Sequence, residues 1–451
     1  MLEAKEWLAR PLLPGFIALC LALLSVWSPW LLLAIPCLLL SFRDGKVWAA
    51  VLVMAGLGWW IRPLPGVAIE DSRLFHGEAV VASVPRERGA ALIAEARIRE
   101  GRVVLRLPPH AEASLGDRLL VQGSMRSPRP SQARSGFIAE IKSSVAPQVL
   151  SPGPSVWRWG QWIRESFEGF LAASVPERQA PLVDALCFGV TTGMSDEDLE
   201  LIRQSGGAHL IAASGANVAF LLVLVWAGIK WIPLPLWLRS MALAFVLIVY
   251  AGAAGLNPPI VRAVIMAVIL GGSLLAEREP DLLNTLCTAG ILSLLLNSWE
   301  VISPSFWLSF AAVAGLILFS RSSSNLFLST LYASLAASLA TAPLVGYWFG
   351  TIPLMGIIVT LLTGPLALIL MALSLGSWIV WLALPALGRL LGVLSEGLAS
   401  WMLIVFIQFG GPWQVSLQVP PFSPWWLAPF YLLGLLMAPG TKQREADGPR
   451  Y

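Results

Sequence analysis

Charged side chains are scarce in this chain of 451 residues. Only 13% of the residues are Asp, Glu, Lys or Arg, whereas 57% are hydrophobic, and the mean hydropathy is +0.73. Average globular domains carry roughly 25% charged residues, so this chain has too little polar surface to cover a water-soluble particle. The composition therefore predicts a polytopic membrane protein and excludes soluble enzymes, nucleic-acid-binding tails and disordered chains.

Histidine and cysteine are also rare. The histidines are far apart in the sequence: His76, His110 and His209. Such a small supply excludes a histidine-rich metal site, and no metal or cofactor is predicted. The cysteines lie in or beside apolar runs: Cys20, Cys37, Cys187 and Cys287. They are predicted to be small packing residues rather than a disulfide framework.

The few charges that exist are concentrated in one region. Residues 61–150 hold 13 of the 30 Lys and Arg residues and 9 of the 27 Asp and Glu residues. Short alternating segments recur there, separated by Gly, Pro and polar turns: 78–83, 90–98, 102–107, 117–123 and 136–142. Five strands of this size predict a small closed barrel such as an OB-fold. The fold alone does not give a function.

Three apolar runs precede this insert, at 11–27, 29–42 and 47–61. A cleaved signal peptide is an alternative reading of the first run, but no small-residue cleavage site precedes the second run. Basic residues lie before the first run and between the second and third: Lys5, Arg10, Arg43 and Lys46. The positive-inside rule then predicts a cytoplasmic N-terminus and an extracytoplasmic insert, in the cytoplasmic (inner) membrane of the cell.

The remainder of the chain is dominated by membrane sequence. Residues 157–174 predict an amphipathic interfacial helix, and Ser195 with Asp198 has the spacing of a capping box at a helix start. Apolar spans follow at 209–232, 237–254, 259–276, 282–297, 304–320, 326–349, 352–372, 374–388, 390–410 and 424–438. The predicted fold class is an α-helical polytopic membrane protein of about 11–13 spans with a small all-β, OB-like extracytoplasmic insert.

This reading divides the chain into five parts. They are N-terminal transmembrane helices (1–62), the OB-like domain (63–150), amphipathic and connecting helices (151–206), the transmembrane core (207–438) and a polar tail (439–451).

The most unusual segment is 206–218, where small residues cluster around His209, Ser214 and Asn217. Ser214 and Asn217 are three residues apart and share a helical face, and the small residues permit close packing or a broken helix beside a cavity. A nucleophilic Ser214 with a His209 base is the alternative. The nucleophile-elbow pattern is missing there, and no acidic partner for His209 is evident nearby.

Three other segments place polar groups at the start of apolar spans. Arg262 follows a Pro pair and either snorkels to the interface or faces a polyanion or a buried carboxylate. Asp281 and Asn284 belong to a charged loop whose default role is mutual pairing in solvent. Ser309, beside Phe310, has a hydroxyl able to bond within its own helix.

In this order, these segments resemble the ComEC family of competence membrane proteins. The matching stretches are ALCFGVTTGMS (185–195), GGAHLIAASGANVA (206–219), PPIVRAVIM (258–266), EREPDLLNTL (277–286), SPSFWLSFAAVAGL (303–316) and TAPLVGYWFGTIPLMG (341–356). The family residues found here are His209, Ser214, Gly215, Arg262, Asp281, Asn284, Ser309 and Phe310. Asn217 stands where the family usually has a second His, and Val190 where an Asp is common.

The resemblance implies an inner-membrane channel that passes single-stranded DNA into the cytoplasm during natural transformation. It implies single-stranded DNA and membrane lipid as partners, together with a DNA receptor and a separate nuclease. No GxxxxGK(S/T) loop is present, so an ATP-driven motor is expected on another chain. The metallo-β-lactamase-like domain of many members is expected to be absent, and the chain is expected not to be an enzyme. The alternatives are a channel or transporter for another solute such as a small anion, a membrane-embedded serine hydrolase, and an anchor whose OB-like domain recruits partners.

Overall fold

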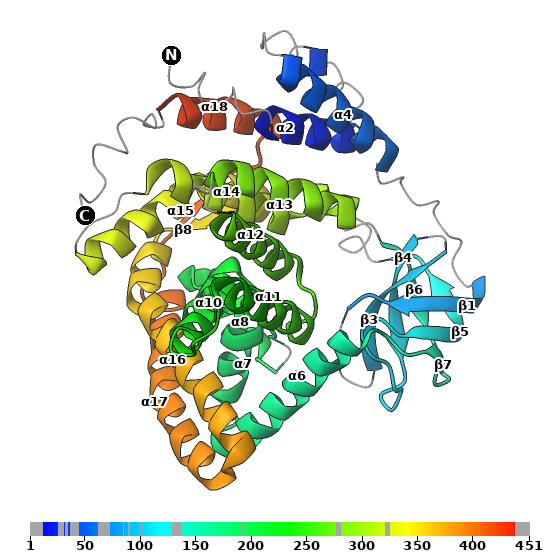
Figure 1. Ribbon diagram of the computed structural model, residues 1–451, viewed down its shortest axis with the longest axis vertical. Coiled ribbons are helices and arrows are strands. Elements are labelled where there is room, and N and C mark those ends of the chain that lie inside the picture. The colour runs from blue at the N-terminus through cyan, green and yellow to red at the C-terminus, as the bar shows by residue number, and fades with distance from the viewer. Residues whose placement is uncertain are drawn as a thin grey trace.

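The computed structural model combines a helical membrane core with a small β-barrel on one side of it (Figure 1). It describes residues 12–25, 31, 35–36, 45–61, 73–83, 85–88, 91–99, 101–128, 137–191, 193–276, 281–320 and 325–437. Most of the predicted span 29–42, Cys37, the loop residues 277–280 and the polar tail lie outside the described residues.

The barrel is built from one antiparallel sheet with a single parallel contact. Its strands are β1 (Arg73–Val81), β2 (Arg86–Arg88), β3 (Ala91–Ile98), β4 (Gly101–Leu107), β5 (Arg118–Arg126), β6 (Phe137–Lys142) and β7 (Gln148–Ser151). The order is β1-β3-β4-β6-β5, and β5 pairs back onto β1, which closes the barrel. β4 and β6 run parallel, so the five long strands form a Greek-key barrel of the OB type.

Alternation along the strands explains why this region folds as a barrel. In β3, every second side chain is buried while its neighbours are partly or fully exposed. The inward residues form one apolar core that includes Val103, Leu105, Leu119 and Ile141. Alternation of this kind places one face of each strand inside and the other in water. The five predicted strands are present, and the short strands β2 and β7 are additions that the alternation did not reveal.

Among the described residues, four helices are long and apolar enough to cross a membrane: Leu236–Ala253, Leu328–Phe349, Gly356–Ala383 and Pro385–Gly410. Shorter apolar helices are Leu12–Leu24, Ala49–Trp60, Gly215–Ile229, Pro258–Ser273, Leu282–Leu296 and Pro304–Phe319. The chain is therefore a mostly helical membrane protein with an OB-like insert.

The helices before the core are α2 (Leu12–Leu24), α4 (Gly45–Ile61), α6 (Ser155–Ser174), α7 (Ala180–Phe188), α8 (Asp196–Ser205) and α9 (Ala208–Ile211). Next come α10 (Gly215–Ile229), α11 (Leu236–Ala253), α12 (Pro258–Leu275), α13 (Leu282–Leu296), η2 (Ser298–Ile302) and α14 (Pro304–Phe319). The last elements are α15 (Leu326–Phe349), β8 (Thr351–Pro353), α16 (Gly356–Ala383), α17 (Pro385–Gly410), β9 (Ser416–Gln418), η3 (Pro424–Trp426) and α18 (Leu427–Met437).

Three apolar clusters hold the described helices together, the smallest of which joins α2 to α4 through Ala18, Val47 and Val51. The largest one joins α6, α7 and α10–α12 to α16 and α17, with Phe167, Phe188 and Phe406 fully buried in it. The third joins α2, α13 and α14, where Phe16 stacks on Phe310.

Helix boundaries differ from the sequence-based expectation in two places. Residues 352–410, expected as the spans 352–372, 374–388 and 390–410, form α16 and α17, because a single break falls at Leu384, just before Pro385, rather than at residues 373 and 389. Pro begins a helix readily, while a single Gly is tolerated inside one. The expected span 209–232 is interrupted at residues 212–214.

The predicted interfacial helix and the predicted helix start at Ser195 are both present. α6 buries Phe167 and Leu171 and leaves Trp159 and Trp162 exposed, which fits a helix at the membrane interface. Ser195 caps α8 by accepting a hydrogen bond from the backbone N–H of Asp198 at 3.0 Å, as the capping-box spacing predicts.

Candidate functional site

The interrupted helix lies at the centre of the site. α8 ends at Gly206, whose φ of +83° suits glycine, and the single turn α9 carries His209. Residues 212–214 are then extended before α10 begins at Gly215. Non-helical backbone at membrane depth is tolerated where it is buried in protein or lines a cavity.

This extended segment does line a cavity, which has a volume of about 460 Å³ and is open on one side. Its lining residues are Gly189, Thr191, Ala208, Ile211, Ala212, Ala213, Asn257, Pro258, Pro259, Ser303 and Ser305. All of them except Asn257 belong to four of the stretches that carry the family resemblance, although those stretches are up to about 120 residues apart in the sequence. In the described part of the chain, no charged side chain lines this cavity.

The end of α7 forms one wall of the cavity and is fixed by two side chains from other helices. Asn217 Nδ2 donates to the Leu186 carbonyl at 3.0 Å, and the Tyr250 hydroxyl donates to the Cys187 carbonyl at 2.7 Å. The last carbonyls of a helix have no partner within it, so these donors satisfy groups that would otherwise be buried and unpaired. An Asn at position 217 therefore has a structural role as a hydrogen-bond donor.

Gly189 and Val190 explain how the broken segment approaches α7. Gly189 has a φ of +70°, and a Cβ there would lie 2.5 Å from Ala213. Only glycine therefore fits both the turn and the contact. Val190 is 5% exposed and packs in the largest apolar cluster, so an apolar side chain suits the position where the family commonly has Asp.

His209 and Ser214 do not form a nucleophile–base pair. The Ser214 hydroxyl donates to Asn217 Oδ1 at 2.9 Å. His209 Nδ1 lies 2.9 Å from the Gly206 carbonyl, and Nε2 lies 3.2 Å from Thr360 Oγ1. Both ring nitrogens therefore have partners other than Ser214, and a base must be in hydrogen-bond reach of its nucleophile.

Arg262 lies beneath the cavity with its charge neutralised. Its side chain is 3% exposed, and Nη1 donates to Glu300 Oε2 at 2.7 Å. Nη2 donates to the carbonyl of Ser305, which lines the cavity, at 2.9 Å. The sequence allowed Arg262 to lie at the membrane interface, to face a polyanion or to pair with a buried carboxylate, and in the structure it pairs with a buried carboxylate. Glu300 belongs to η2 and is itself buried.

None of the site residues predicted from the sequence is among the residues that line the cavity, and the remaining family residues lie on the supporting helices. Asp281 caps α13 by accepting from the backbone N–H groups of Leu283 and Asn284, and the Asn284 amide also donates to it. Phe310 is buried against Phe16 and Phe306. Ser309 is half-buried, and its hydroxyl makes no hydrogen bond within the described residues. These positions stabilise the helices that present the site.

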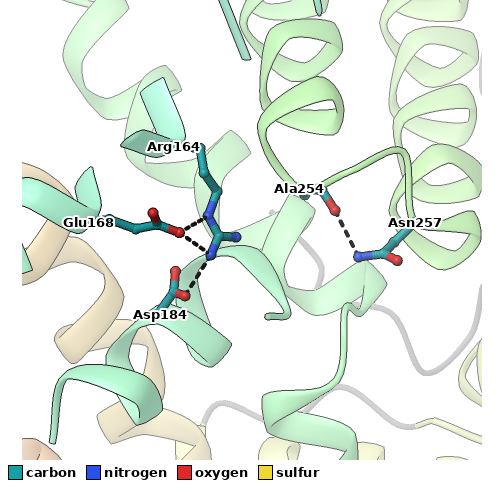
Figure 2. A network of polar contacts seen from close by, with 5 residues as sticks. All are labelled: Arg164, Glu168, Asp184, Ala254 and Asn257. Atoms are coloured by element: carbon teal, nitrogen blue, oxygen red, sulfur yellow. Dashed lines mark hydrogen bonds and ion pairs between the residues drawn. The ribbon is translucent and has the colours of Figure 1, made fainter. Parts of the chain in front are cut away.

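A second ionic cluster was not expected from the sequence. Arg164 of α6 donates to Glu168 and, at 2.8 Å, to Asp184 of α7. Figure 2 shows the guanidinium between the two carboxylates, beside the bond from Asn257 to the Ala254 carbonyl that shapes the cavity wall. The cluster fixes the interfacial helix to the helix whose end forms the cavity.

Neither Glu300 nor Asp184 was named as a partner from the sequence, but Glu300 could have been identified. Glu300 and Arg262 are isolated opposite charges in an apolar region, and such charges generally pair. Asp184 carried no such signal, because the spacing between α6 and α7 does not reveal which faces meet.

Comparison with known proteins gives the family. The model of the competence protein family matches residues 186–442, more than half of the chain. The chain belongs to this family. The ComE operon protein 3 of Bacillus subtilis (strain 168) is 28% identical over 250 residues, which are 53% of this chain and 31% of that protein. The uncharacterized protein YcaI of Escherichia coli (strain K12) is 32% identical over 146 residues, 29% of this chain and 18% of that protein.

The matched region thus spans less than a third of each of these relatives. No solved structure matches the chain. The competence match contains the broken helix, the Arg262–Glu300 pair and all of the residues that line the cavity. Within the described residues, no group of His, Cys, Asp and Glu side chains is arranged to hold a metal ion.

Proposed function

We propose that the membrane core passes single-stranded DNA during competence, through a path that begins at the cavity between α9, α12 and α14. The observation that carries the proposal is the convergence of four distant family stretches on one open cavity at a broken helix. Family membership supplies the substrate class, and the geometry supports a site where a strand could be received.

The size and lining of the cavity suit a nucleotide strand. Its volume of about 460 Å³ is within the range of roughly 300–1,000 Å³ seen for small-molecule sites, so it fits one nucleotide at a time rather than a duplex. The lining offers hydroxyl and amide groups from Thr191, Asn257, Ser303 and Ser305. Such groups bond to sugar and phosphate oxygens of any sequence.

Phosphate groups would be attracted here by helix ends rather than by Lys or Arg. α10, α12 and α14 all begin at or next to the cavity, and the positive end of each helix dipole favours anions. The backbone N–H groups of Gly215, Ala216 and Asn217 have no acceptor among the described residues. Arg262 adds little positive electrostatic potential to the cavity, because Glu300 neutralises its charge.

The distribution of cations indicates which side the cavity faces. Lys230 follows the far end of α10, and Arg239 lies in the first turn of α11, whose other end adjoins the cavity. Arg278 and Arg321 follow the far ends of α12 and α14 in the sequence. The positive-inside rule places these ends in the cytoplasm, so the cavity faces the extracytoplasmic side, as the insert is expected to. An electrostatic interaction between Arg102 of β4 and Glu300 supports this arrangement.

The experiment uses a transformable host in which this chain is the resident competence protein. Ala212→Trp is designed to fill the cavity, and Ala386→Trp, at an exposed site on α17, is the matched control. We expect labelled DNA that has become resistant to external nuclease to fall at least tenfold in the first variant only. Normal DNA internalisation by Ala212→Trp at a normal protein level would contradict the cavity as the path. Normal internalisation in a deletion strain would favour a different solute.

A further inference from the structure

A second, purely apolar groove lies between α10 and α16. It has a volume of about 200 Å³ and is lined by Phe220, Val223, Leu224, Ala227, Leu368, Met371 and Ala372. The α10 residues have the i, i+3, i+4, i+7 spacing of one helix face. Val223 is 61% exposed, so the groove opens toward the surroundings of the protein, which at this depth are lipid.

The same face of α10 continues to a pair of cations. Three residues beyond Ala227 it reaches Lys230, which is exposed, with Nζ 5.4 Å from the centre of the Trp231 ring. Arg239 is fixed beside this turn because Nη2 donates to the Ile232 carbonyl at 3.1 Å. Neither cation pairs with an acidic side chain within the described residues, and Arg239 Nε has no acceptor there.

We propose that this groove and its two cations form a binding site for an anionic phospholipid of the surrounding bilayer. One acyl chain lies along the groove, because an apolar groove of this size stays dry unless an apolar group fills it. The phosphate sits at Lys230 and Arg239, where each cation strengthens attraction to anionic lipid. Trp231, 81% exposed, lies at headgroup depth, where amphipathic aromatic rings concentrate.

The order of the apolar groove and the two cations along α10 favours a phospholipid over an apolar peptide as the ligand. The groove is apolar over two turns of α10, and the charge begins only at the end of the helix. This is the arrangement of a lipid, which has a long apolar tail and one anionic group at the water boundary. The site is distinct from the cavity, since none of its residues lines the cavity.

The test uses the full-length protein purified in mild detergent and stripped of lipid, with native mass spectrometry as the readout. Phosphatidylglycerol and phosphatidylcholine with identical acyl chains are the probes. We expect phosphatidylglycerol to be retained roughly 30-fold more than phosphatidylcholine, the scale expected for two cations at a membrane surface. Equal retention of the two lipids would overturn the proposal.

Three variants separate the parts of the site, and a fourth is the control. Lys230→Ala combined with Arg239→Ala should abolish the headgroup preference. Ala227→Phe and, independently, Ala372→Phe should reduce retention of both lipids by filling the groove. Arg389→Ala removes an exposed cation from α17 and should change nothing. Persistence of the preference in the double variant, or full retention in both Phe variants, would refute the assignment.

Discussion

The ion pair of Arg262 and Glu300 is the most constrained feature at the scale of single residues. Two opposite charges lie in the apolar core, 2.7 Å apart, and join α12 to η2. Removing charges from water is costly, and the cost is offset only while both partners stay in place. The pair therefore fixes the relative positions of the two segments that carry Asn257 and Ser305 into the cavity.

Replacing one partner of this pair should be far more harmful than replacing both. Glu300→Gln leaves a buried guanidinium without its counter-charge and should lower the free energy of unfolding by about 3–5 kcal/mol. The combined change Arg262→Met and Glu300→Leu should cost much less. Thermal unfolding in detergent, followed by tryptophan fluorescence, measures both. A double variant that is as unstable as the single one would show that the pair contributes nothing by charge.

Asn217 and Ser214 should respond differently to truncation, although they share a hydrogen bond. Asn217→Ala leaves the buried Leu186 carbonyl unpaired and should destabilise the protein by about 1–3 kcal/mol. Ser214→Ala removes a half-buried donor and leaves the Asn217 donor in place. We expect it to unfold nearly as the parent does and to support normal DNA uptake. Loss of uptake in a correctly inserted Ser214→Ala protein would revive the hydrolase alternative.

At the scale of helices and strands, the sequence predicted most of the elements but not their interruptions. The alternation of apolar and polar residues along 78–142 was sufficient to predict the barrel, because each strand of a closed barrel has one face in the apolar core and one face in water. The break at 212–214 could only be anticipated as an option, since small apolar residues are compatible with both a continuous and a broken helix. The break is packed against Gly189 and the end of α7, which Tyr250 fixes, and both come from other parts of the chain.

The cap of α13 gives a test at this scale. Asp281→Ala removes the acceptor for the N–H groups of Leu283 and Asn284 and should lower the stability by about 0.5–2 kcal/mol. Asp281→Asn keeps an acceptor oxygen and serves as the control. Hydrogen exchange of the first turn of α13 should rise in the first variant only. Equal exchange in the two variants would mean that the charge, rather than the cap, is important.

Close packing of α14 against α15 gives a second test. A Cβ on Gly315 would lie 2.6 Å from the Cβ of Ala340 and 2.7 Å from the Ala336 carbonyl, whereas a Cβ on Gly376 would meet nothing within 4 Å. Small residues at such contacts let helices approach closely in membranes. Gly315→Val should therefore cost about 1–3 kcal/mol more than Gly376→Val. Similar melting temperatures for the two variants would contradict the packing.

At the scale of the whole molecule, the low charge was the most informative property of the sequence. It predicted the membrane class and separated the insert, and the few remaining charges are the basis of the proposed orientation. A buried carboxylate near Arg262 could be expected from the sequence, but the pairing of Arg164 with Asp184 could not, because it depends on which helix faces meet. The predicted site residues lie on the elements around the cavity, whereas the residues that line it could not be chosen without the fold.

The orientation can be tested in intact cells with a variant lacking the four native cysteines. Ser303→Cys, at the cavity, should react with a membrane-impermeant maleimide added from outside. Lys230→Cys should react only after the membrane is permeabilised. The reverse pattern of labelling would invert the topology and, with it, the direction proposed for the strand.

The apolar layer beneath the cavity has a consequence for the energy supply of the cell. Ile260 and Phe306, which directly follow the lining residues Pro259 and Ser305, and Val264, one turn further along α12, are all buried. Water and ions are excluded from dry apolar packing of this kind. Under the proposed function, a passing strand displaces this packing, which otherwise insulates the membrane and preserves its proton gradient when no DNA is present.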